Sequence, residues 1–89
     1  MTSSGSISDV QGRIQEANRL AEDSRGALNE ARKNIDEARN MLQHAMSGSA
    51  QDDVEEAIRL YSDAVEKLDD VQDAVAQAVR QAEEVSARL

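Results

Sequence analysis

Apolar and small residues recur at alternating steps of three and four along almost the whole chain, with one interruption near the middle. Before the interruption the repeat runs from Ile7 to Ala45, and after it the repeat runs from Val54 to Leu89. Such steps place side chains on one face of an α-helix. The pattern therefore predicts two long helices, over residues 7–46 and 53–88, joined by a turn over residues 47–52.

The interruption holds residues suited to ending one helix and starting another. Gly48 can adopt the positive φ that terminates a helix, and Ser49 or Asp52 can accept hydrogen bonds from the first free amides of the next helix. Residues 1–6 are predicted to form a flexible tail. We therefore expect an all-α fold with one helical-hairpin domain over residues 7–89, an antiparallel helix-turn-helix coiled coil.

Each predicted helix has a seam of apolar and small residues that would face the other helix. The first seam consists of Ile7, Val10, Ile14, Ala17, Ala21, Ser24, Leu28, Ala31, Ile35, Ala38, Leu42 and Ala45. The second seam consists of Val54, Ala57, Tyr61, Ala64, Leu68, Val71, Val75, Ala78, Ala82, Val85 and Leu89. In an antiparallel hairpin these seams fit when the numbers of facing residues add to 99. Large residues then face small ones, as close packing requires.

Further apolar residues lie beside these seams and would stay in water in a lone hairpin. We expect them to form an interface with another protein surface: Leu20, Met41, Ile58, Leu60, Val65 and Val79. In addition, Ala21 faces Ala78 and Ala17 faces Ala82, so this part of the seam is thin. Because each large exposed side chain forgoes roughly 1.5–3 kcal/mol of burial, we expect a homodimer that forms a four-helix bundle.

Composition and charge narrow the classes of function. The 89 residues include no Pro and no Cys and one aromatic residue, Tyr61, so the sequence favours a thin helical protein without thiol chemistry. The net charge of -8 argues against nonspecific binding to nucleic acid or to anionic membranes. From Ser47 onward there are 11 acidic and 4 basic residues, so the second helix carries most of the excess charge.

Two groups of charged residues could carry chemistry, and for each a plainer interpretation is favoured. An acidic stripe could hold a divalent cation, but a helix surface provides no cage, so we expect a solvated face at Asp63, Glu66, Asp69, Asp70 and Asp73. The arginines Arg25, Arg32 and Arg39 could receive an acidic partner, but local ion pairs with Glu22 and Asp36 are favoured.

The single histidine, His44, has no second metal-ligating residue at helical spacing, so it reads as a surface residue. Tyr61 reads as a core residue with its hydroxyl in water. The sequence offers no catalytic constellation and no site for a metal or cofactor. We therefore expect a protein without enzymatic activity.

The turn carries a family resemblance. Met46-Ser47-Gly48-Ser49-Ala50, with Val54 four residues further on, resembles the W-x-G-x-A-x-x-x-F pattern of the small helical-hairpin proteins associated with type VII secretion. Met46 occupies the position of the Trp and Val54 that of the Phe. The family's export signal, Tyr followed four residues later by Asp or Glu, is absent. The resemblance implies a non-enzymatic hairpin that pairs with itself or a sister hairpin and accompanies a larger effector.

Two functional hypotheses follow. The first is a scaffold or regulator in the cytoplasm that binds a protein partner through helical packing, without nucleic-acid binding or membrane insertion. The alternative is a secretion-associated hairpin or effector chaperone, secreted without a cleaved signal peptide, because the N-terminus shows no charged segment followed by an apolar run. Both hypotheses require the same shape.

Overall fold

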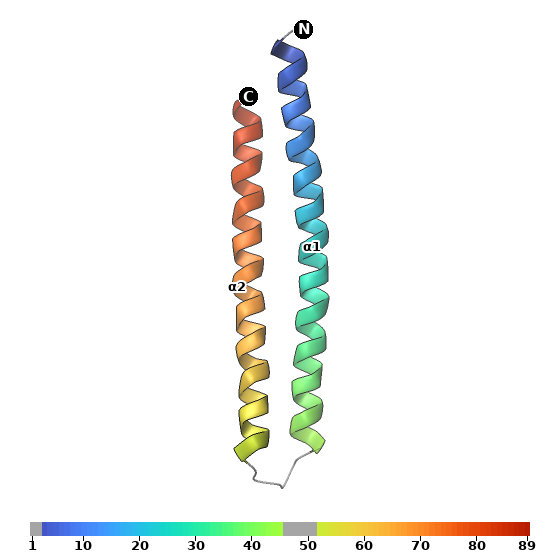
Figure 1. Cartoon of the computed structure of the whole chain (residues 1–89), viewed down its shortest axis with the longest axis vertical. Helices are drawn as coiled ribbons and strands as arrows, with labels where there is room; N and C mark the ends of the chain where they lie inside the picture. The colour runs from blue at the N-terminus through green and yellow to red at the C-terminus, as the bar shows by residue number, and fades with distance from the viewer. Residues whose placement is uncertain (1–2, 46–51) are drawn as a thin grey trace.

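Two long helices lie side by side and antiparallel in the computed structural model, which describes residues 3–45 and 52–89 (Figure 1). Helix α1 spans Ser3–Ala45 and helix α2 spans Asp52–Arg88. The molecule is a rod of 71 × 15 × 14 Å. Its radius of gyration, 20.4 Å, is well above the roughly 12 Å typical of a compact domain of this length. The predicted all-helical, two-helix architecture is confirmed.

The helix ends differ slightly from the prediction. Helix α1 begins at Ser3, so residues 3–6, which the sequence assigned to a flexible tail, form its first turn. No proline interrupts this segment, and adding a turn to an existing helix costs far less than nucleating one. Helix α2 begins one residue before the predicted start. The predicted turn residues Ser47 to Gln51, including Gly48, lie outside the described residues.

The two helices pack directly against each other, but they bury little. Among the described residues, one hydrophobic side chain, that of Val65, is buried, at 7% exposed. Leu28, Ile35, Leu42, Leu68 and Val75 are only half-buried. Two helices can cover only a narrow stripe of each other, so a single hairpin of this kind has a seam rather than a core.

The pairing of residues along the hairpin follows the predicted register. Hydrogen bonds across the helices join Gln11 to Ser86 and Arg25 to Gln72, whose numbers add to 97 in both pairs. Further bonds join Arg32 to Asp69 and Arg39 to Ser62, whose numbers add to 101. These values lie on either side of the predicted 99, so the helices face each other at the expected levels.

The rotation of each helix about its axis differs from the prediction. In the half away from the turn, predicted seam residues are exposed: Ile7, Val10, Ala17, Ser24, Val71, Ala78 and Val85. The residues that follow most of them are half-buried instead: Gln11, Asn18, Arg25, Gln72, Val79 and Ser86. Tyr61, also predicted in the seam, is 37% exposed. The long stems of Gln and Arg cover more apolar surface than Ala or Ser, which favours their place between the helices.

Candidate interaction surface

The contact between the helices divides the rod into two unlike sides. In heptad notation most of the half-buried residues occupy positions a and d, with Gln11 and Ile58 at a and Ile14 and Leu68 at d. In an antiparallel pair, the e positions of both helices flank one side and the g positions flank the other. We call these the polar side and the apolar side.

The polar side is held together by hydrogen bonds between the helices. Arg32 donates to both oxygens of Asp69 in a forked pair, with Nε to Oδ1 at 2.6 Å and Nη2 to Oδ2 at 3.2 Å. Gln72 donates to the backbone oxygen of Arg25 at 2.9 Å and accepts from the Arg25 side chain at 3.3 Å. Gln11 donates to the backbone oxygen of Ser86 at 3.1 Å. Polar partners at fixed heptad levels favour one register over its neighbours.

These contacts correct two predictions about charged residues. Arg25 and Arg39 make the predicted local ion pairs, with Glu22 and Asp36. Arg32 instead pairs across the helices with Asp69. Asp69 was predicted to belong to a solvated acidic stripe, but the rotation of α2 brings it to the edge beside α1.

Two ion pairs perturb the titration of their members. The hydrogen bond with Arg19 lowers the pKa of Glu16, because it stabilises the ionised carboxylate. The hydrogen bond from Arg32 to Asp69 raises the pKa of Arg32, for the same reason applied to a cation. Both arginines and Glu16 are solvent-exposed, so these pairs contribute little to stability.

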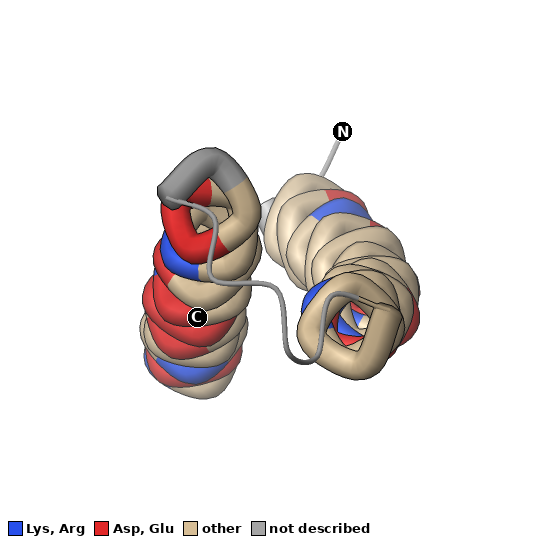
Figure 2. The backbone as a smooth tube through the Cα atoms, turned by 90° about the horizontal axis from the view of Figure 1, so that it is seen from below, with Lys and Arg blue, Asp and Glu red and all other residues tan. Residues whose placement is uncertain are grey.

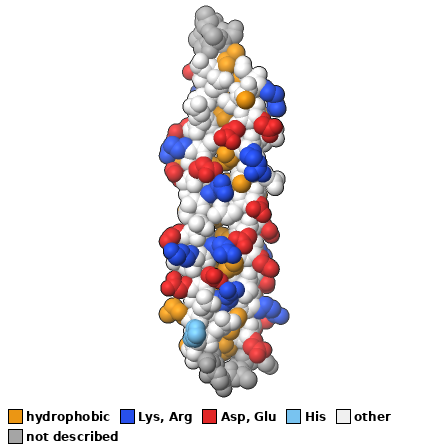
Figure 3. Space-filling model, turned by 180° about the vertical axis from the view of Figure 1, so that it is seen from behind, with side chains coloured by type: hydrophobic (Ala, Val, Ile, Leu, Met, Phe, Trp, Pro, Cys, Tyr) orange, Lys and Arg blue, Asp and Glu red, His pale blue; other side chains and the backbone are white. Residues whose placement is uncertain are grey.

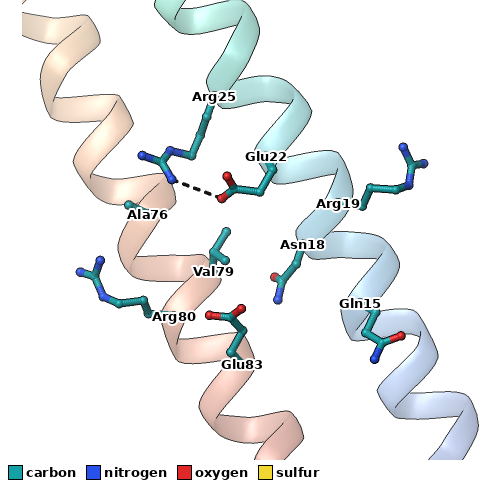
Figure 4. Close-up of a pocket in the computed structure, with 9 residues that line it drawn as sticks. All are labelled: Gln15, Asn18, Arg19, Glu22, Arg25, Ala76, Val79, Arg80 and Glu83. Atoms are coloured by element: carbon teal, nitrogen blue, oxygen red, sulfur yellow. Dashed lines mark hydrogen bonds and ion pairs between the residues drawn. The ribbon is translucent and has the colours of Figure 1, made fainter.

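A shallow groove of about 390 Å³ runs along the polar side, in the half away from the turn. Figure 4 shows Glu22 and Arg25 of α1 joined over one end and Val79 of α2 between the helices. Its lining is mixed in charge and largely open. The groove lies at the levels where alanines were predicted to face each other, and one alanine, Ala76, contributes to its lining.

Charged side chains cover the polar side along its length, as the space-filling view in Figure 3 shows. In the end-on view of Figure 2, the charged residues of α2 lie mainly on the side away from α1. The charge is therefore concentrated on the polar and outer faces of the hairpin.

The apolar side has a different composition. It is formed by heptad positions g and c of both helices. The apolar and small residues at these positions are Val10, Ala17, Leu20, Ser24, Ala27, Ala31, Ala38, Met41 and Ala45 on α1, and Ala57, Leu60, Ala64, Val71, Ala74, Ala78 and Val85 on α2. Position c also holds three basic residues, Arg13, Lys67 and Arg88, and two amides, Asn34 and Gln81. Within residues 10–45 and 54–89, no Asp or Glu occupies position g or c.

Large apolar side chains on this side are exposed. Leu20, Met41 and Leu60 are 54%, 67% and 58% exposed, and Val10 and Val71 are 45% and 44% exposed. Single exposed apolar residues are ordinary, but several of them on one side of a rod mark a surface suited to contact with another molecule.

The predicted interface residues therefore separate into two groups. Leu20, Met41 and Leu60 lie on the apolar side in contact with solvent, as expected for a lone hairpin. Val65, by contrast, is buried, and Ile58 and Val79 are half-buried. The helix that covers these three side chains is α1. The prediction that they lie beside the two-helix seam is therefore wrong. The apolar repeat has members at three heptad positions, and it does not by itself decide which two face the other helix.

Among residues 3–45 and 52–89, no group of three or more His, Asp or Glu side chains is arranged to hold a metal ion. Within the same ranges, neither helix contains a segment long and apolar enough to cross a membrane.

The chain matches no model of a known protein family, and neither curated proteins nor solved structures yield a match to it.

Proposed function

We propose that this protein is a non-enzymatic interaction module, a scaffold or regulator that binds protein helices through its apolar side and pairs with a second copy to form a four-helix bundle. The observation that carries the proposal is the apolar side, where position g is apolar or small throughout and no acidic residue occupies position g or c within residues 10–45 and 54–89. Although the net charge of the chain is -8, burial of this side would remove no carboxylate at position g or c from water.

The width of the apolar pattern supports a bundle over an isolated two-stranded coiled coil. On α2, apolar or small residues fill positions a, d and g at most levels, as in Ile58, Tyr61 and Ala64. Helices that face the core of a bundle typically show three apolar positions per heptad, whereas a two-stranded seam needs two. The third position needs another helix to cover it.

The exposed area supports the same proposal. The hairpin exposes 6606 Å², whereas a compact monomer of 9.7 kDa would expose roughly 5,100 Å². The difference, about 1,500 Å² for each chain, would give a dimer interface of about 3,000 Å² in total. Obligate homodimers commonly bury 2,000–5,000 Å². A second copy would therefore remove the excess surface of the first.

Co-purification of two differently tagged copies tests this proposal. Leu20→Glu places a charge on the apolar side at an exposed position, and Asn40→Glu adds the same charge at an exposed position away from it. We expect the wild type and Asn40→Glu to recover the second copy and Leu20→Glu to lose it, while circular dichroism shows helix in all three, at a reduced level in Leu20→Glu. Equal recovery by Leu20→Glu would refute the apolar side as the binding surface.

Partner proteins captured from native cells should follow the same pattern. An amphipathic partner helix would cover the residues that self-association covers, so the two should compete. The acidic outer face of α2 would favour basic partners at low salt and would affect the association rate more than the affinity. Partner recovery that rises as the homodimer concentration rises would contradict this competition.

The alternative function, a secretion-associated hairpin or effector chaperone, rests on the resemblance at residues 46–50 and Val54 together with the hairpin architecture. It predicts that the native protein accumulates in culture medium without a cytoplasmic lysis marker. Confinement of the protein to the cell pellet would exclude this alternative and leave the interaction module in the cytoplasm.

A further inference from the structure

We propose that the apolar side receives a second copy of this chain in the antiparallel orientation, with α1 against the partner's α1 and α2 against the partner's α2. The two-fold axis would then pass near Ala27 and Val71. This inference rests on the proposed self-association and goes further by assigning the orientation and the contact residues.

Two identical hairpins can lay the same side face to face in only two symmetric ways. If the turns lie at the same end, α1 meets the partner's α2, and facing residues again have numbers that add to about 99. If the turns lie at opposite ends, each helix meets its own copy. Full overlap of the rods then pairs residues whose numbers add to about 55 on α1 and about 142 on α2. Such an isologous contact is the commonest form of dimer.

The arrangement with both turns at one end brings unfavourable pairs together. Arg13 would face Arg88 of the partner subunit, so two cations would meet at each margin of the interface. Like charges opposite each other cost affinity.

The antiparallel arrangement separates these cations, because Arg13 and Arg88 each then lie opposite the turn end of the partner subunit. Val10 would face Ala45 of the partner subunit, Val85 would face Ala57 of the partner subunit, and Val71 would meet its own copy at the two-fold axis. Arg13 would lie over the exposed Met41 of the partner subunit, where its aliphatic stem can cover apolar surface while the guanidinium reaches water. The side chains that would otherwise be exposed at each end are then covered.

Single-cysteine cross-linking distinguishes the two orientations, because the described residues contain no free cysteine and the sequence contains none. A residue near the two-fold axis meets its own copy. We therefore expect Ala27→Cys and Val71→Cys each to form a disulfide-linked dimer under mild oxidation. Glu30→Cys, on the outer face, is the control and should stay unlinked. With the turns at one end, Ala27→Cys would instead cross-link to Ala74→Cys in a mixture of the two variants.

A distance between spin labels at His44→Cys provides a second measurement. In the antiparallel dimer the two labels lie about 33 residue levels apart, or about 50 Å at 1.5 Å per residue. With both turns at one end they would lie roughly 20–25 Å apart, given interaxial distances of 8–10 Å. Self-linked Ala27→Cys with the long label distance supports the inference. A mixed Ala27–Ala74 link with the short distance overturns the orientation but keeps the proposed dimer, whereas a monomer mass at every concentration overturns both.

Discussion

Truncation of Val65 tests which face of α2 packs against α1. Val65 is 7% exposed, so Val65→Ala removes two buried methyl groups at about 0.8 kcal/mol each. Alanine regains about 0.5 kcal/mol of helix propensity. The net loss in free energy of unfolding is therefore about 1 kcal/mol, or about a fivefold fall in the ratio of folded to unfolded chains.

Val71→Ala is the matched control, because the sequence pattern placed Val71 in the seam. Val71 is 44% exposed, so the same truncation removes only about half as much buried surface. After the gain in propensity, the net loss is a few tenths of a kcal/mol. Urea unfolding followed by circular dichroism, at concentrations where the chain is monomeric, should give this order. At higher concentrations the cost of Val71→Ala should rise, because the proposed dimer buries Val71.

The reverse order would refute this reasoning. If Val71→Ala destabilises the monomer more than Val65→Ala, then α2 turns the face expected from the sequence toward α1. The apolar side would then have to be redrawn around Val65.

Two further predictions address the register and the electrostatics. Cysteines at Ala38 and Tyr61 should cross-link within one chain because their numbers add to 99, whereas a pair at Ala38 and Leu68 should not; closure of the second pair alone would contradict the register. For the Glu16–Arg19 pair, whose carboxylate has a lowered pKa, the contribution to folding is present above the ordinary pKa of Glu and is lost as the pH falls through the lowered value. An NMR titration should show the pKa of Glu16 returning toward its ordinary value in Arg19→Gln, and an unchanged titration would show that the pair does not form.

The sequence predicted the elements and their register well, because both depend on periodicity. Long runs of apolar steps without proline specify two long helices, and matching large residues to small ones across the hairpin specifies how they overlap. The pairs Arg25–Gln72 and Arg32–Asp69 lie two levels to either side of the predicted sum. The level at which each residue of α1 faces α2 could therefore be predicted from the sequence.

The rotation of each helix about its own axis could not be predicted in the same way. The apolar and small residues of the hairpin occupy mainly three heptad positions, a, d and g, so either d with g or a with d could face the other helix. The sequence pattern favoured d with g on α1, because position g holds alanines and position a holds polar residues. In the structure the stems of Arg25 and Arg32 occupy the flank of the seam and carry their head groups to α2. Hydrogen bonds across the helices depend on side-chain reach, which hydropathy does not encode. The position of Val65 followed from that rotation.

The mass of the protein in solution tests the central claim most directly. Sedimentation equilibrium over a range of micromolar concentrations should give twice the chain mass of 9.7 kDa for the wild type and for Asn40→Glu. Leu20→Glu should approach the mass of a single chain, with reduced helicity, because the hairpin alone buries so little. A wild type that stays at 9.7 kDa and still unfolds cooperatively would contradict the account, because its exposed apolar side would then need no second copy to cover it.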